Sequence, residues 1–503
     1  MSDPPAVTGA HQPVRTIFGA LMLVMLLASL DQTIVSTALP TIVGEFGELA
    51  HLSWIVTAYL LATTVVTPLY GKLGDLFGRK IVLQSAILIF LLGSALCGLS
   101  QSMGQLIAFR AVQGLGGGGL IVTTSAAIGD IIPPRDRARY QGLFGAVWGL
   151  STILGPLIGG FFVEHVSWRW IFYINLPLGF LVVAVIGWAF TAPAPSRRPR
   201  IDVAGAALLA VALTALILLA SLGGHALAWQ SPAALGLAAA FLAGLAGFVA
   251  VERTTAEPIL PLGLFRNRVF SIACAVGFIV GLSMFGSITF MPLYLQIVKG
   301  ISPTQAGMAL APMMAGMLVS SIATGRIIQR IGRYRPFPII GTALMTIGLA
   351  LLATLKLGTA VPVACGFVML LGFGMGLVMQ VLVLAVQNAV EHRHLGVGTS
   401  GATLFRTIGG TVGVSVFGAI FTATLTSGLA GLLPAGSPIP TATAPAAIQA
   451  LPAAERTIYL QAFTAALHPV FLYAAAIAAI GFILTWFLKS LPLRGGAPVK
   501  PKR

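Results

Sequence analysis

Two charged residues stand inside apolar stretches of this sequence, where they could handle a proton. Asp31 lies in SLDQTIVSTALP, residues 29–40, and Arg110 lies in LIAFRAVQGLGGGG, residues 106–119. Burial favours the neutral form of a carboxyl group, whereas a nearby arginine favours its charged form. A pair that forms in one conformation and separates in another could therefore take up and release a proton.

The depth of the two residues is compatible with such a pair. At 1.5 Å per helical residue, Asp31 lies about 13 Å from Pro40, and Arg110 lies about 9 Å from the start of its own apolar segment. Asp31 is the only deep acid among the 13 of the chain. The two side chains could face a common cavity, or they could form a static ion pair that only fixes helix packing.

The composition is that of an integral membrane protein. Of the 503 residues, 57% are hydrophobic and only 8% are charged, and the mean hydropathy is +0.96; soluble domains carry about 25% charged residues. The net charge of +16 does not indicate nucleic-acid binding, because the basic residues collect in loops on one side. The cysteines, Cys97, Cys274 and Cys365, lie in apolar segments with no metal-binding spacing.

Fourteen apolar segments are each long enough to cross the membrane, which needs about 20 residues. They are residues 16–39, 52–70, 81–103, 104–128, 140–163, 170–192, 203–222, 233–251, 269–295, 303–324, 337–355, 359–386, 397–424 and 467–488. The expected fold class is therefore an all-α membrane protein with fourteen transmembrane helices.

The distribution of basic residues orients these segments. Only Arg169, Lys299, Lys356 and Arg456 fall in the connections on one side, while most of the 29 lysines and arginines fall on the other. By the positive-inside rule, both chain ends are cytoplasmic. The only long outer connection, residues 425–466, is rich in Ala, Pro and Thr, and we expect it to be flexible or partly ordered.

A glycine-containing loop, GKLGDLFGRK, joins the second and third segments. Its glycines give the backbone freedom for a tight turn, and one acid among several bases can form ion pairs between helix ends. The residues expected to act in this loop are Gly71, Asp75, Gly78, Arg79 and Lys80. A weaker copy, GRIIQRIGRYR, begins at Gly325 and carries Gln329 in place of the acid, as expected for an internal duplication.

Two further segments carry closely spaced glycines. Gly114, Gly116 and Gly119 satisfy a dinucleotide-binding pattern, but no strand precedes them, so close helix packing is the favoured interpretation. The fifth segment, GLFGAVWGLSTILGPLIGG, has small residues every three or four positions and one proline. Its principal residues are Gly155, Pro156, Gly159 and Gly160.

These patterns together resemble those of the major facilitator superfamily, and in particular its fourteen-span drug/proton antiporters. The resemblance rests on the loop motif at 71–80, the arginine motif around Arg110, the antiporter motif at 142–160 and the first-helix motif at 30–40. It implies a proton-coupling role for Asp31 and Arg110. It also implies six-helix bundles at residues 16–192 and 269–488, an inserted pair at 203–251, an N-terminal cytoplasmic tail at 1–15 and a basic tail at 489–503.

The function implied is export of lipophilic drugs or toxic compounds across a bacterial inner membrane in exchange for protons, without enzymatic activity. No ATP-binding motif is present, and no cofactor or metal is expected. The expected partners are lipophilic small molecules, protons and the bilayer, and we expect a monomer. The candidate substrate-cavity residues are Gln32, Trp148, Phe285, Tyr294, Gln380 and Arg406.

Two alternatives remain at this point. A dedicated exporter of one endogenous metabolite, antibiotic or lipid would carry the same motifs. A membrane-embedded enzyme or a non-transporting sensor is disfavoured, because the loops lack the convergent titratable groups that an active site needs.

Overall fold

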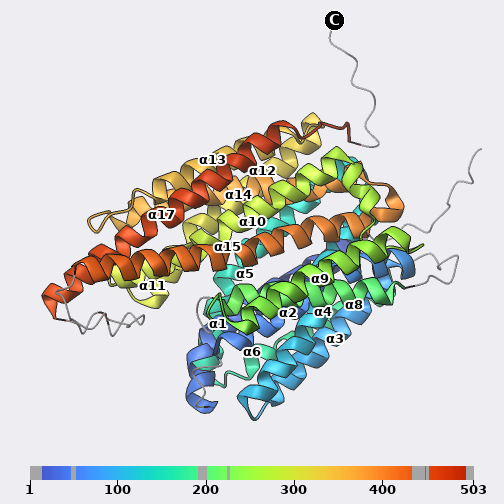
Figure 1. The fold of residues 1–503 in the computed structure, drawn as a ribbon. Coiled ribbons are helices and arrows are strands. Elements are labelled where there is room, and N and C mark those ends of the chain that lie inside the picture. The colour runs from blue at the N-terminus through green and yellow to red at the C-terminus, as the bar shows by residue number, and fades with distance from the viewer. Residues whose placement is uncertain are drawn as a thin grey trace, which may run out of the picture.

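The computed structural model describes residues 14–46, 52–190, 201–223, 227–432, 448 and 452–493, most of them helical (Figure 1). The first seven helices are α1 (Val14–Phe46), α2 (Leu52–Phe77), α3 (Arg79–Leu99), α4 (Met103–Ile131), α5 (Pro134–His165), α6 (Trp170–Tyr173) and α7 (Asn175–Ala189). Two helices follow, α8 (Val203–Leu222) and α9 (Pro232–Thr254). The remainder are α10 (Arg268–Leu293), α11 (Pro303–Met308), α12 (Ala311–Ile331), α13 (Pro336–Leu352), α14 (Val361–Ala389), α15 (Leu395–Leu432) and α17 (Ala453–Trp486).

The prediction of an all-α membrane protein is confirmed. Within the described residues, 13 helical segments are long and apolar enough to cross a membrane, and α13 is a shorter apolar helix. Every one of the fourteen predicted segments coincides with one of these helical segments. Large apolar side chains are exposed on the outside of the helices, among them Leu157, Phe180, Trp188 and Leu242. Such a surface suits a lipid environment.

Two predicted spans are interrupted rather than continuous. Residues 170–192 contain the short helix α6 followed by α7, and residues 303–324 contain α11 followed by α12. Pro177 lies in the first turn of α7 and Pro312 in the first turn of α12. Proline has no N–H group to continue a preceding helix, but it fits the first turn of a new one.

The predicted outer loop at 425–466 was too long. Helix α15 continues to Leu432, and α17 begins at Ala453. Hydropathy marks the part of a helix that lies in lipid, whereas these helices continue in Ala-rich and Thr-rich sequence where apolar residues thin out. In Figure 1, α15 and α17 reach furthest at the left of the view. Residues 433–447 and 449–451 of the predicted loop lie outside the described residues.

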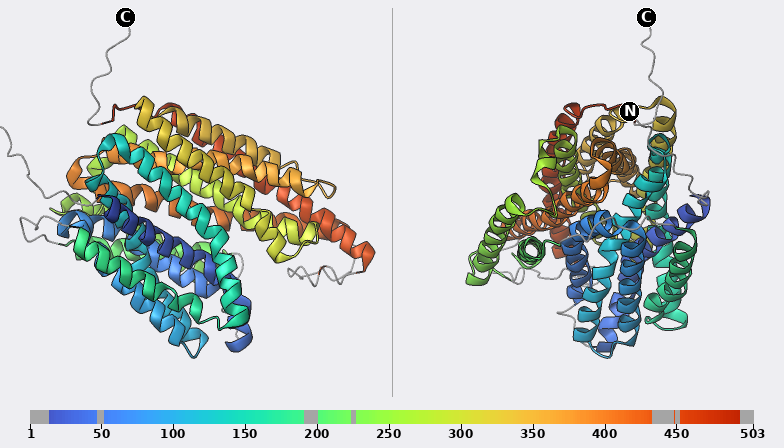
Figure 2. Two further views of the ribbon diagram at one scale, coloured as in Figure 1. Left: turned by 180° about the vertical axis from the view of Figure 1, so that it is seen from behind. Right: turned by 90° about the vertical axis from the view of Figure 1, so that its right-hand side faces the viewer.

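The helices pack mainly within two sets, called here the N-terminal half (α1–α7) and the C-terminal half (α10–α17). In the N-terminal half α1 packs on α5, and α4 packs on α2 and α3; in the C-terminal half α10 packs on α15, and α14 packs on α12 and α13. Helices α8 and α9 pack on each other, and α8 also contacts α2 and α15. Between the halves, α5 packs on α12, and α2 packs on α15. The rear view in Figure 2 shows α5 running alongside helices of both halves.

The glycines that mimic a dinucleotide-binding pattern serve close packing. A Cβ atom at Gly114 would lie 2.5 Å from the carbonyl oxygen of Tyr59 on α2, and one at Gly116 would lie 2.6 Å from that of Ala86 on α3. Glycine is therefore required where the backbones of α2, α3 and α4 approach one another.

Candidate functional site

Asp31 and Arg110 form a buried ion pair in the N-terminal half. The Arg110 Nη1 atom donates to Asp31 Oδ2 at 2.8 Å, and neither side chain is more than 2% exposed. Arg110 also donates through Nε to the carbonyl oxygen of Ile55 on α2 at 3.2 Å. The Tyr59 ring stacks against the guanidinium, with 4.2 Å between the Arg110 Cζ atom and the ring centroid. The sequence placed these two residues at compatible depths, and the structure joins them.

Two amide side chains complete the surroundings of the carboxylate. Gln113 Nε2 donates to Asp31 Oδ1 at 2.7 Å, and Asn175 Nδ2 donates to the same oxygen at 3.1 Å. Both amides also donate to the hydroxyl of Ser94, at 3.1 and 3.0 Å. All three side chains are fully buried. The network thus ties α1 to α3, α4 and α7.

Gln113, Asn175 and Ser94 were not among the residues predicted for the site. Gln113 follows Arg110 by three positions, which places it on the same face of α4, so the helical spacing could have identified it. Helical spacing could not have identified Asn175 or Ser94, because these residues lie on other helices than Asp31 and Arg110.

The sequence left open whether Asp31 and Arg110 face a common cavity or form a static pair, and in this conformation the described residues enclose the Asp31 carboxylate. Asp31 is 0% exposed and lies among helices of the N-terminal half alone. Its carboxylate accepts three side-chain hydrogen bonds. In this conformation the carboxylate is therefore closed to a substrate.

The other side of α1 lies against α5. The hydroxyls of Ser29 and Ser151 are 2.6 Å apart, and Thr33 Oγ1 donates to the Ser151 carbonyl oxygen at 2.9 Å. A Cβ atom at Gly155 would overlap the Thr33 side chain, and one at Gly159 would lie 2.9 Å from the Ile34 carbonyl oxygen. These glycines let α5 approach the helix that carries Asp31.

The other two predicted residues of this segment do not share that contact. Pro156 is exposed, and a Cβ atom at Gly160 would meet no other atom within 4 Å. The close approach of α5 to α1 therefore depends on Gly155 and Gly159.

The predicted loop between α2 and α3 contacts the C-terminal half. It lies at the basic end, defined here as the end of the helices that carries Arg79, Lys80, Arg137, Arg330 and Arg393. Asp75 accepts hydrogen bonds from the backbone N–H groups of Gly396 and Val397, each at 2.9 Å, in the first turn of α15. A carboxylate is favourable at a helix N-terminus, where N–H groups have no intrahelical partner.

Basic residues hold this loop in place. Arg79 pairs with Asp75 and, through Nε at 3.1 Å, with Asp130 on α4. Lys80 donates to the carbonyl oxygen of Gly187 on α7 at 2.7 Å. Gly78, at φ 90°, has the left-handed backbone that lets α3 begin directly after α2.

Gly71 allows α2 to approach α15. A Cβ atom there would overlap the Ser400 side chain and lie 2.7 Å from the Gly396 carbonyl oxygen. Of the five predicted loop residues, Gly71, Asp75 and Arg79 contact α15 of the other half directly, while Gly78 and Lys80 shape and brace the loop.

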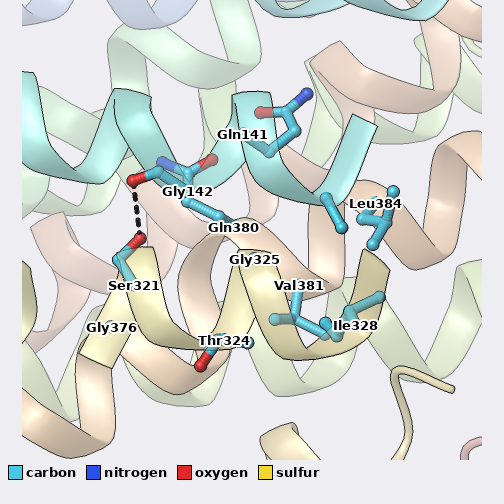
Figure 3. Close-up of a pocket in the computed structure, with 11 residues that line it drawn as sticks. Gln141, Gly142, Ser321, Thr324, Gly325, Ile328, Gly376, Gln380, Val381 and Leu384 are labelled. Atoms are coloured by element: carbon cyan, nitrogen blue, oxygen red, sulfur yellow. Dashed lines mark hydrogen bonds between the residues drawn. The ribbon is translucent and has the colours of Figure 1, made fainter. Parts of the chain in front are cut away.

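The weaker copy of the loop makes a matching contact between α12 and α5. Gln329 Nε2 donates to Asp136 Oδ1 at 2.6 Å, and a Cβ atom at Gly325 would lie 2.5 Å from the Ala138 carbonyl oxygen. In Figure 3 the Ser321 hydroxyl donates to the Gly142 carbonyl oxygen at 3.0 Å, one turn further along. In this copy the acid, Asp136, lies on α5, and the amide of Gln329 is its donor on α12.

The candidate cavity residues are dispersed in the structure. Gln380 lines a small pocket between α5, α12 and α14 near the basic end, together with Gln141 and Ser321 (Figure 3). Trp148 and Gln32 are partly exposed on α5 and α1.

Of the two remaining aromatic candidates, the structure describes the side chain of one. Tyr294 is fully buried in this conformation and donates to the Lys356 carbonyl oxygen at 2.9 Å. The side chain of Phe285 lies outside the described residues.

Comparison with known proteins identifies the family. A family profile described as Major Facilitator Superfamily matches residues 21–414. The chain is 43% identical to an uncharacterized MFS-type transporter of Mycobacterium tuberculosis, over 96% of this chain and 70% of that protein. It is 38% identical to the multidrug transporter protein MdtP of Bacillus subtilis, over 96% of this chain and 94% of that protein. The chain is also 34% identical to an Aspergillus aculeatus protein named acurin A biosynthesis cluster MFS-type transporter, over 95% of this chain and 89% of that protein.

A solved structure shows the same fold. The human organic anion transporter MFSD10 superposes with a TM-score of 0.65 at 16% identity, covering 94% of this chain and 99% of that one. Together with the family profile and the close relatives, the fold shows that this chain belongs to the Major Facilitator Superfamily of membrane transporters.

Proposed function

We propose that this transporter is a proton-coupled antiporter that exports lipophilic drugs or toxic compounds across the bacterial cytoplasmic membrane. The observation that carries the proposal is the fully buried Asp31–Arg110 pair with its amide partners. Charged side chains inside transmembrane segments are costly and mark ion or substrate pathways. The name of the multidrug transporter relative supports export of drugs.

A proton on Asp31 would change the balance of this network. The neutral carboxyl group no longer compensates the charge of Arg110, and the ion pair that joins α1 to α4 weakens. Rearrangement of α1 then becomes less costly, and its other side lies on α5, a helix that contacts the C-terminal half. The proton gradient is the driving force in this proposal, and no cofactor takes part.

Alternating access would proceed by rocking of two six-helix bundles, residues 16–192 and 269–488, around a central site. Hydrogen bonds between the halves gather at the basic end, at Asp75, Asp136 and Ser321. These contacts close the basic end in the present conformation and must break for it to open. The inserted pair, residues 203–251, would follow this motion through the contacts of α8 with α2 and α15.

The basic end is assigned to the cytoplasm on the positive-inside rule, which also places both chain termini there. The transporter acts as a monomer in this proposal, with lipophilic small molecules and protons as its partners.

A dedicated exporter of one metabolite is the second candidate. It is favoured by the 34% identical relative whose name assigns it to a biosynthesis cluster. A deletion strain separates the two candidates: hypersensitivity to several unrelated lipophilic compounds supports multidrug export, whereas sensitivity to a single compound supports the dedicated exporter.

The proposed function is tested in proteoliposomes with an imposed proton gradient and a panel of lipophilic fluorescent compounds. We expect transport that stops when an ionophore collapses the gradient. Transport at the same rate with and without a gradient contradicts proton coupling, and the absence of transport for the whole panel contradicts multidrug export.

A further inference from the structure

Arg406 is a second arginine deep within a membrane helix. It follows the first residue of α15, Leu395, by eleven positions, which is about 16 Å along the helix axis. The hydrocarbon core is about 30 Å thick, so this distance places Arg406 well inside the span. An arginine at this depth is costly unless an anion compensates its charge.

No residue that the structure describes supplies that anion. Arg406 forms no hydrogen bond or ion pair with the described part of the chain, although its guanidinium carries five N–H donors. Arg110, by contrast, is bonded to Asp31, to Gln113 and to a backbone carbonyl oxygen. Arg406 is also partly exposed. Among the described residues its charge is therefore uncompensated, and the residue is not fully enclosed.

The side chain leaves α15 on the side away from the lipid-facing inserted pair. Ser415 donates to the Ala220 carbonyl oxygen on α8, which fixes the face of α15 that α8 covers. Arg406 precedes Ser415 by nine positions, or about 180° around a helix of 3.6 residues per turn. Arg406 therefore points into the protein.

On that side, the backbone of α10 lies close to α15. A Cβ atom at Gly277 would lie 3.9 Å from the Arg406 Cβ atom, and one at Gly281 would overlap the Arg406 carbonyl oxygen. Gly277 thus lies beside the stem of Arg406, and Gly281 lets the backbones of α10 and α15 approach closely.

We propose that Arg406 binds the acidic group of the exported compound, so that the substrates of this transporter include lipophilic acids with a carboxylate or sulfonate. This inference rests on the proposed export function and specifies its substrate class. A planar guanidinium binds a carboxylate through two parallel hydrogen bonds. A cationic substrate would meet repulsion from Arg406, and the carboxylate of Asp31 is enclosed by its three donors.

Binding of a matched pair of ligands tests this assignment. The purified transporter in phosphatidylcholine nanodiscs is titrated with 1-pyrenebutyric acid and with 1-pyrenebutyramide, which share an apolar body and differ in charge. We expect the acid to bind at least about tenfold more tightly, a difference of about 1.4 kcal/mol. Arg406→Gln should remove this preference while leaving amide binding unchanged, and Arg406→Lys should keep part of it.

Arg330→Gln is the matched control, because it removes the same charge from an exposed position at the basic end. It should bind both ligands as the wild type does. Equal affinity of the wild type for acid and amide overturns the proposal. The proposal is also overturned if Arg406→Gln loses affinity for the acid and for the amide equally while its melting temperature is unchanged.

A lipid phosphate could also supply the anion that Arg406 binds, and nanodiscs that contain phosphatidylglycerol distinguish it from a substrate. Displacement of the acid by this lipid overturns the assignment to substrate, whereas no displacement supports it.

Transport in proteoliposomes separates the anion site from the export function. Binding of the acid through Arg406 without gradient-driven transport contradicts the export function alone. Gradient-driven transport with no preference for the acid contradicts the anion site alone.

Discussion

Arg110 and Asp31 lie 79 positions apart in the sequence, yet their side chains meet at 2.8 Å in the interior of the N-terminal half. Both charges are removed from water, so each depends on the other. Removing one partner of a buried pair typically costs about 3–5 kcal/mol, because the remaining charge stays buried without compensation. A variant of either residue must therefore be tested for folding as well as for transport.

Asp31→Asn should abolish proton-driven efflux, with a loss of at least about tenfold, equivalent to 1.4 kcal/mol. An amide of the same shape can still accept from Gln113 and Asn175, but it cannot exchange a proton or compensate Arg110. The measurement is efflux from vesicles with an imposed proton gradient, with Glu164→Gln, at an exposed acid, as the control.

The double variant Asp31→Asn with Arg110→Gln separates coupling from folding. It removes both charges, so its thermal stability should recover relative to Asp31→Asn, while efflux stays lost. Proton-driven efflux at the wild-type rate in either variant would show that Asp31 does not carry the proton.

Gly155→Ala should disturb the contact between α5 and α1, whereas Gly160→Ala should not. The added methyl group at position 155 overlaps Thr33, while the same group at position 160 meets nothing within 4 Å. Overpacking of this kind costs about 1–3 kcal/mol. Thermal melting of the two purified variants checks the prediction, and equal melting temperatures would contradict the close contact.

The sequence predicted the helices and the principal charged pair well, because both depend on local signals. Apolar segments of the required length identified the membrane helices, and the depth of Asp31 and Arg110 follows from the rise per residue. The spacing from Arg110 could have identified Gln113, whereas the role of Asn175 depends on how the helices pack. The length of α17 was also missed, since hydropathy does not register a helix that continues beyond the lipid.

Gln329→Glu should weaken the closed basic end, because it places a second carboxylate against Asp136 on α5. The repulsion between partly exposed groups of this kind is about 1 kcal/mol or less. It should lower the thermal stability and alter the efflux rate at neutral pH. Adding Asp136→Asn restores a carboxylate–amide pair with exchanged positions and should recover both properties. No recovery in the double variant would show that this contact does not join the halves.

Glu45 lies at the end of the N-terminal half opposite the basic end. Its ionisation should make the stability of the protein depend on pH. Hydrogen bonds from Arg169 and from the Trp168 indole hold the pKa of Glu45 below its ordinary value of 4.5. A lowered folded-state pKa means that the stabilisation is present above about pH 4.5 and is lost as the pH falls through the folded-state pKa. The side chains of Glu45 and Arg169 are 42% and 30% exposed, so their ion pair should contribute less than about 1 kcal/mol to the free energy of unfolding.

Thermal melting between neutral and acidic pH, compared for the wild type and Glu45→Gln, measures this contribution. The variant should be less stable at neutral pH, and its difference from the wild type should vanish at acidic pH. Glu164→Gln, at an exposed acid near the end of α5, should show no such convergence. A difference between Glu45→Gln and the wild type that stays constant with pH would contradict the ion pair, because a loss of packing alone does not titrate.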